Sequence, residues 1–246
     1  MPCYYLPDIS DLQNRQFIIE GEEYHHICQV LRKREDDHIL VTSGSGILAD
    51  CRIVKIEKKL LLIEITNRNI IERSDPQIAL AFALLKNKHD SMIIEKATEL
   101  GCSMFYPMET ERTVRKNSFN QQNKFQKIAI AAMKQCDNAW LPGIKECSDI
   151  SKIPQLMRQN GFIPVVALET EKKRSLSEIK SQFPKESLGI IIGPEGGFSP
   201  KEVDFLANTD VISFSLGNHI LRAETAAIAA ISQLSGFNYN LNREYY

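Results

Sequence analysis

Two glycine-rich turns in the last quarter of the chain constrain the fold more than any other feature. Residues 193–197 (GPEGG) follow the apolar residues 190–192, and residues 216–219 (LGNH) follow the mostly apolar residues 211–214. Each turn precedes a segment of helical character. A short strand, a tight turn and a helix start, found twice in succession, are typical of an α/β fold whose ligands bind at the carboxyl ends of the strands.

The residues after each turn indicate where the next helix begins. Residues 199–202 (SPKE) have the pattern of a capping box with proline at the first helical position. Residues 220–225 (ILRAET) are predicted to open a second helix, with Arg222 and Thr225 on one face of it. Two ordinary strand–helix connections would have a similar pattern. An arginine and two glutamates beside two dense turns favour a ligand site.

The chemistry of the turns limits the kind of ligand. Neither turn has the G-x-x-x-x-G-K-[ST] pattern of a phosphate-binding loop, and neither has the G-x-G-x-x-G of a dinucleotide site. The carboxylate of Glu195 would repel a phosphate group. A ligand with a cationic centre fits these turns better.

The two turns carry a resemblance to a known family. GPEGGFSPKE and LGNHILRAETA are similar to the two C-terminal motifs of the bacterial 16S ribosomal RNA uridine-N3 methyltransferases, which belong to the SPOUT class of S-adenosylmethionine-dependent enzymes. Earlier blocks also resemble this family: KNKHD followed by EKATELG, the residues Pro107, Glu111, Arg112 and Lys116, and Gln135 with Pro142. The family usually has arginine where this chain has His219 and near Asn138, and these departures affect the expected RNA contacts more than the cofactor site.

The first part of the chain reads as a small β-rich domain. Residues 37–42, 47–56 and 60–66 are strand candidates, and residues 22–31 form a candidate helix before them. The following turn-forming residues 72–76 (ERSDP) indicate a domain boundary. The resemblance implies a PUA-like, RNA-binding β-barrel domain at residues 1–72, because VLRKREDD matches the family's basic segment there.

Strands and helices alternate in residues 73–246, which favours a mainly parallel sheet covered by helices. The resemblance identifies this part as a SPOUT methyltransferase domain with a C-terminal trefoil knot. A knot is expected from the resemblance alone, since chains rarely thread through their own loops. The predicted strands are residues 77–85, 102–108, 162–168 and 188–192, and the predicted helices are residues 91–100, 117–135 and 149–160.

Composition excludes several classes of protein. The net charge is −1, so any contact with nucleic acid must come from local basic patches. The 6 cysteines contain no C-x-x-C pair, which argues against a zinc site and a disulfide framework, and we expect no metal. No leader sequence or membrane-length apolar run is visible. We expect a cytoplasmic protein with no membrane contact.

The resemblance implies S-adenosyl-L-methionine as cofactor and assigns roles at the turns. Arg222 is the candidate that stabilises negative charge on the uracil, because arginine stays protonated. Glu195 is the second catalytic candidate. Whether Glu195 or Glu224 takes the N3 proton, or merely orients Arg222, stays open. The expected cofactor-binding residues are Leu168, Gly193, Glu195, Gly196, Gly197, Leu216, Gly217, Ile220, Leu221, Glu224 and Thr225.

A basic stretch is the main RNA signal of the composition. Residues 112–134 carry six cations and almost no acids, although a solvated helix face would look similar. The expected partners are 16S ribosomal RNA in the small ribosomal subunit and a second copy of the chain in a homodimer. The predicted RNA-binding residues are Arg32, Lys33, Arg34, Lys86, Lys88, Arg112, Arg115 and Lys116.

Two other functions fit the same residues. One is a SPOUT methyltransferase for a different RNA nucleotide. The other is a non-catalytic RNA-binding assembly factor, which the departures at His219 and Asn138 would explain. Cofactor binding without methyl transfer would favour the second.

Overall fold

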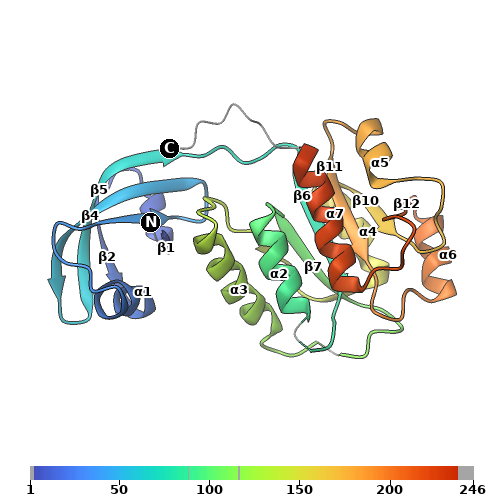
Figure 1. Cartoon of the computed structure of the whole chain (residues 1–246), viewed down its shortest axis with the longest axis horizontal. Helices are drawn as coiled ribbons and strands as arrows, with labels where there is room; N and C mark the ends of the chain where they lie inside the picture. The colour runs from blue at the N-terminus through green and yellow to red at the C-terminus, as the bar shows by residue number, and fades with distance from the viewer. Residues whose placement is uncertain (1–2, 88, 116, 238–246) are drawn as a thin grey trace. The chain divides into compact units, whose positions relative to one another are not determined.

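The computed structural model describes residues 3–87, 89–115 and 117–237 (Figure 1). The chain divides into two compact units, the first running to Arg73 with the later segment Ile130–Leu141, and the second taking Ser74–Ala129 and the residues from Pro142 onward. Residues 130–141 belong to the second domain in the sequence-based division. In the structure their contacts include a hydrogen bond from Trp140 Nε1 to the carbonyl oxygen of Ile71 at 2.9 Å. The domain limits 1–72 and 73–246 stay a prediction.

The first unit is built on a curled sheet of five strands in the order β1-β3-β4-β5-β2. β1 pairs with β3 in parallel, and the other neighbours are antiparallel. Side chains of β4 and β5 alternate between buried and partly exposed, as expected for a sheet with one face on a core. The elements are β1 (Cys3–Tyr5), η1 (Pro7–Ser10), β2 (Gln16–Glu20), α1 (Gly21–His25), η2 (His26–Val30), β3 (His38–Thr42), β4 (Ile47–Glu57) and β5 (Leu60–Ile70).

The predicted strands of this unit are present, and the small curled sheet confirms the expected PUA-like architecture. The predicted helix at residues 22–31 is a short α-helix continued by one π-helical turn. β1 and β2 were missed because each is short and forms one edge of the sheet.

The second unit is a parallel sheet with the strand order β12-β10-β11-β6-β7-β8, and β9 also pairs with β7. All of these pairings are parallel, which confirms the predicted sheet type. The elements are β6 (Ile78–Ala83), α2 (His89–Glu99), β7 (Met104–Glu109), α3 (Gln121–Gln135, its last turns in the first unit), β8 (Gly143–Ile144), β9 (Ser148–Asp149), η3 (Ile150–Lys152), α4 (Ile153–Gln159), β10 (Phe162–Ala167), α5 (Leu176–Gln182), β11 (Ser187–Ile192), α6 (Pro200–Asn208), β12 (Ile212–Phe214) and α7 (Ala223–Phe237).

Helices cover both faces of this sheet, so β6 is buried along its whole length. On one face the alanines of β6 pack in a cluster with Met157 of α4 and Leu206 of α6. On the other face Phe82 of β6 lies against Phe125 of α3, with ring centroids 5.8 Å apart. α2 and α7 pack side by side, and α7 contacts β6 and β11 (Figure 1).

The order of the strands defines where a ligand can bind. From β6 the chain proceeds to β7 on one side, and it later returns to β10, β11 and β12 on the other side. The strand order therefore reverses between β6 and β11, and crevices at such switch points are the usual ligand sites of open α/β sheets. The loops that follow β6, β10, β11 and β12 all leave the same edge of the sheet.

Two helices begin at this edge of the sheet. α6 starts where the sequence predicts, and α7 starts later than Ile220. Ser199 and Glu202 form the predicted capping box of α6. α7 begins at Ala223, and the carbonyl oxygen of Arg222 accepts the first helical hydrogen bond from Ala226 N–H at 2.8 Å. Arg222 thus caps α7 from outside it, and the helix starts within the predicted residues 220–225, three residues after Ile220.

Two further helices depart from the sequence-based limits. α3 begins at Gln121 instead of residue 117, because Asn117 N–H is bonded to the Glu109 carboxylate at 2.8 Å. α5 was missed, although Ser175 and Glu178 form the same kind of capping box as Ser199 and Glu202. In the described part of the chain, no helix has the length and apolar character needed to cross a membrane.

Candidate functional site

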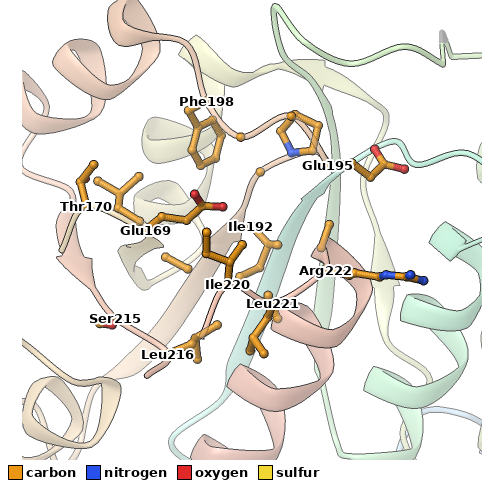
Figure 2. A pocket seen from close by; sticks show the side chains of 18 of the residues that line it. Glu169, Thr170, Ile192, Glu195, Phe198, Ser215, Leu216, Ile220, Leu221 and Arg222 are labelled. Carbon is orange, nitrogen blue, oxygen red and sulfur yellow. The ribbon is translucent and has the colours of Figure 1, made fainter. Parts of the chain in front are cut away.

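Three loops of the second unit enclose a cavity of about 500 Å³ at the carboxyl ends of β10, β11 and β12 (Figure 2). Both glycine-rich turns contribute to its wall, as the sequence predicts. Most of the residues expected to bind the cofactor line this cavity: Leu168, Gly193, Glu195, Gly196, Gly197, Leu216, Gly217, Ile220 and Leu221.

The glycine turn after β11 is shaped by steric limits at specific positions. A Cβ atom on Gly193 would lie 3.0 Å from the ring of Phe198, another lining residue. Gly197 has φ +66° and closes the turn with a hydrogen bond from its N–H to the carbonyl of Pro194 at 2.9 Å. Gly196 has no positive φ, and a Cβ there would make only ordinary contacts, the nearest with Arg112 at 3.6 Å.

The same turn is held from outside by residues that follow β7. Arg112 Nη1 donates to the carbonyl oxygen of Gly196 at 2.7 Å, and Arg112 itself lines the cavity. The buried carboxylate of Glu202 accepts the N–H of Glu111 at 2.7 Å while it also caps α6. Two contacts therefore connect residues 111–112 to residues 196–202. Arg112, predicted to bind RNA, directs one donor to the cofactor loop instead.

The loop after β10 supplies lining residues that the sequence analysis missed. Glu169 and Thr170 line the cavity, and Figure 2 shows the Glu169 carboxylate pointing toward its centre. The neighbouring Glu171 accepts a hydrogen bond from Ser213 Oγ at 2.7 Å, which, with the N–H of Lys173, lowers the pKa of Glu171. The rule that ligands bind at strand carboxyl ends applies to β10 as well, so the signal was present in the sequence.

The lining combines apolar surface with charges of both signs. Apolar side chains from all three loops form part of the wall, and the charged side chains are the carboxylates of Glu169 and Glu195 and the cations of Arg112, Lys172 and Arg222. Backbone groups of the glycine turns add hydrogen-bonding positions. Within residues 3–87, 89–115 and 117–237, no group of three or more His, Cys, Asp or Glu side chains could hold a metal ion.

Arg222 and Glu195 both lie at the rim of this cavity, and both side chains are exposed. Arg222 extends away from Leu221 toward the side where α2 lies (Figure 2). Glu195 Oε1 accepts the backbone N–H of Lys86, in the loop after β6, at 3.3 Å. The two catalytic candidates are thus next to the switch point between β6 and β11.

Glu224 and Thr225, also expected to bind the cofactor, do not line the cavity. Successive helical residues rotate by about 100° around the axis, so Ala223 and Ala226 face the cavity while the residues between them turn away. Thr225 is exposed. Glu224 is buried against the start of α2, where its Oε1 lies 3.6 Å from His89 Nδ1.

The cysteines offer no reactive nucleophile near the cavity. All six are free thiols, as predicted. Burial raises the pKa of Cys3, Cys51 and Cys102 to about 12, so these three stay protonated at neutral pH.

Comparison with known proteins identifies the family. Residues 72–235 match the family described as RNA methyltransferase domain, and residues 19–66 match the RNA methyltransferase PUA domain. The chain belongs to the RNA methyltransferase family. This membership confirms the resemblance of the two turn motifs, and the second match agrees with the curled sheet of the first unit.

Named relatives and solved structures resemble this RNA methyltransferase over nearly its whole length. The ribosomal RNA small subunit methyltransferase E of Bacillus subtilis is 36% identical, over 89% of each chain. The protein of the same name from Rickettsia conorii is 31% identical, over 85% of each chain. A methyltransferase of Legionella pneumophila, solved with the cofactor S-adenosylmethionine bound, has a TM-score of 0.82 at 26% identity, with 96% of this chain and 97% of that chain covered.

Some residues of the methyltransferase that were predicted to bind RNA instead bond to other residues of the second unit. Arg115 pairs with Asp90, whose side chain is 0% exposed, and with Gln121. Arg115 therefore holds the loop between β7 and α3 in place. Lys86 is exposed beside Glu195. Lys124 is partly exposed and Lys127 exposed on α3, so the basic stretch offers fewer available cations than its composition indicates. Lys88 and Lys116 lie outside the described residues.

The basic segment of the first unit also contains both cations that already have a partner and cations that are exposed. Lys33 Nζ donates to the carbonyl oxygen of His38 at 3.3 Å. Arg32 and Arg34 have exposed side chains, and Arg32 adopts φ +53° directly after η2. Lys134, at the end of α3, pairs with Glu23 at 2.6 Å. Arg32 and Arg34 are thus the residues of this segment best exposed for a phosphate backbone.

Proposed function

We propose that this protein transfers the methyl group of S-adenosylmethionine to N3 of a specific uridine in 16S ribosomal RNA of the small ribosomal subunit. The observation that carries the proposal is the cavity between the loops after β10, β11 and β12, with an arginine at its rim, in a chain of this family. The curated relatives are named for small-subunit ribosomal RNA methylation, which supports this substrate.

The lining residues fit the cofactor. Bound there, S-adenosylmethionine supplies an electrophilic methyl group on a positively charged sulfur. The apolar side chains of Leu168, Leu216 and Ile220 would hold its purine and carbon chain, and Glu169 would accept hydrogen bonds from its hydroxyl or ammonium groups. The glycines of the turn at residues 193–197 place no side chain in the space that the ligand needs.

The chain's own residues have two tasks in the transfer. They must hold the uracil and the methyl carbon in line, since alignment of the reactants contributes strongly to the rate of a displacement. They must also stabilise the negative charge that develops on the uracil when N3 loses its proton. Arg222 is exposed at the rim and permanently cationic, which supports its assignment to this second task. The base has to be extruded from its RNA stack to reach the rim.

The wider organisation belongs to the same proposal. The first domain, residues 1–72, would bind RNA through Arg32 and Arg34, and residues 73–246 would carry the reaction in the cytoplasm. The two glycine turns would be part of a trefoil knot, and the chain would form a homodimer. Sedimentation equilibrium at micromolar concentration tests the last point, since a species of 28.0 kDa alone would contradict it.

Mass spectrometry of ribosomal RNA from cells that lack this protein tests the function directly. We expect one 3-methyluridine of 16S RNA to disappear and to return when purified protein and S-adenosylmethionine are added to the small subunits. Loss of a different methylated nucleotide would indicate another RNA target. Cofactor binding without any change in the RNA would indicate a non-catalytic assembly factor.

A further inference from the structure

A buried carboxylate on α7, two residues after Arg222, is left incompletely paired. Glu224 lies in the first turn of α7 and is 8% exposed. Its Oε1 lies 3.6 Å from His89 Nδ1, and its Oε2 has no hydrogen-bond partner among the described residues. Leaving a buried polar atom unsatisfied is costly, and the positive end of the helix dipole offsets only part of that cost. Such a group indicates a role beyond packing.

The one side chain within ion-pair distance of this carboxylate is His89, as far as residues 3–87, 89–115 and 117–237 are concerned. His89 is the first residue of α2 and follows the loop after β6, the loop whose Lys86 N–H contacts Glu195. Its side chain is 31% exposed while the Glu224 side chain is 10% exposed. The imidazole is therefore the more accessible member of this pair.

We propose, on the basis of the proposed function, that His89, oriented by Glu224, accepts the proton that leaves uracil N3 during methyl transfer. The two glutamates that the sequence left as candidates are worse placed. Oε2 of Glu224 has virtually no accessible surface, so a nucleobase cannot contact it. Glu195 already accepts the Lys86 N–H and is open to solvent.

The arrangement has the logic of a base held by an orienting carboxylate. A proton on Nδ1 points toward Glu224 and leaves the lone pair of Nε2 for the incoming base. Nε2 takes the N3 proton, and the electron pair of the N3–H bond stays on nitrogen and forms the bond to the methyl carbon. The electron pair of the methyl–sulfur bond remains on sulfur, which becomes a neutral thioether, and His89 later releases its proton to water.

Other charged groups around His89 have separate partners or tasks. Asp90, the next residue of α2, is paired with Arg115. Arg222 precedes α7 at the cavity rim and is assigned to the developing negative charge. The distance of 3.6 Å to Glu224 is slightly longer than a hydrogen bond, and catalytic contacts commonly tighten when substrate binds.

Single-turnover methyl transfer to small subunits from cells lacking the protein tests this assignment. His89→Ala should lower the rate by about 10²-fold, the lower end of the range for loss of a general base, with unchanged affinity for S-adenosylmethionine by calorimetry. Added imidazole should restore part of the rate, because a free base can occupy the vacated space. Glu224→Gln keeps the shape of the side chain and should lower the rate without responding to imidazole. Glu95→Gln, also on α2, is the matched control and should behave like the wild type.

Three results would overturn the assignment. One is a wild-type rate in His89→Ala. Another is a slow His89→Ala variant that imidazole does not rescue, because the loss would then be structural. The third is an unchanged rate in Glu224→Gln. A wild-type protein that binds cofactor but transfers no methyl group is a different outcome: it would overturn the proposed function, and the role of His89 with it.

Discussion

Arg112 Nη1 lies 2.7 Å from the carbonyl oxygen of Gly196, so a residue that follows β7 holds the glycine turn that follows β11. The glycine turn needs this support because glycine adds no side chain that could pack and fix its shape. The carboxylate of Glu202 makes a second contact of the same kind to Glu111 N–H. The cofactor loop is therefore fixed by contacts between segments that are far apart in the sequence.

Removal of the Arg112 contact should weaken cofactor binding. A hydrogen bond from a charged donor contributes about 1.5–3 kcal/mol, so Arg112→Ala should lower the affinity for S-adenosylmethionine about 10-fold or more. Calorimetric titration measures this. Lys201→Ala, an exposed lysine on α6, serves as the control and should bind normally. Equal affinities for both variants would mean that the turn keeps its shape without Arg112.

The two glycines at positions 193 and 196 should differ in their tolerance of a side chain. Gly193→Ala forces Phe198 to move, since the new Cβ would lie 3.0 Å from its ring, and overpacking of this kind costs about 1–3 kcal/mol. Gly196→Ala makes only a 3.6 Å contact with Arg112. We expect a lower melting temperature and weaker cofactor binding for Gly193→Ala alone. The reverse order would contradict this reading of the turn.

Arg222 should matter for catalysis and little for stability. Its side chain is exposed, and only its backbone carbonyl caps α7, so Arg222→Ala should leave the melting temperature and cofactor affinity nearly unchanged. Single-turnover transfer should fall by about 10²-fold, the scale for losing one preorganised electrostatic donor. Arg222→Lys should recover part of the rate, because an ammonium keeps the charge but not the planar fork. A sharp fall in melting temperature would show instead that the residue is structural.

Arg115 should be required for stability instead of RNA binding. Arg115→Ala would leave Asp90 as a buried charge without its cation, and breaking such a pair costs about 3 kcal/mol. Denaturant unfolding should show this loss, and it should shrink when Asp90→Asn is added, since the uncompensated charge is then gone. Lys127→Ala is the surface control. Weaker RNA binding with unchanged stability in Arg115→Ala would restore the original RNA assignment.

Among the described residues of the basic stretch, Lys124 and Lys127 on α3 are the cations that remain for RNA. Charge reversal of both to glutamate should weaken binding to ribosomal RNA of any sequence and flatten its salt dependence, because fewer counterions are released. Filter binding across a salt series measures the slope. An unchanged slope would reduce this part of α3 to a solvated helix face.

Features that depend on neighbouring residues were determined by the sequence alone. The capping box of Ser199 and Glu202 needs only four consecutive residues, and it forms as predicted. The alternation of apolar strands and helices likewise predicted the parallel sheet, because both periodicities are local. The position of the two glycine turns was also predictable. Each turn directly follows a predicted strand, and parallel strands end at the same edge of the sheet.

Which side chains meet at that edge was decided only by the tertiary structure. Lys86 N–H and Glu195 come together because β6 and β11 are neighbours in the sheet, although more than 100 residues separate them in the chain. Glu224 faces His89 because α7 starts at Ala223 and packs against α2, so its direction depends on contact between two helices far apart in the chain. A charged side chain forms its contacts with whatever the strand order brings near, and no local pattern specifies that order.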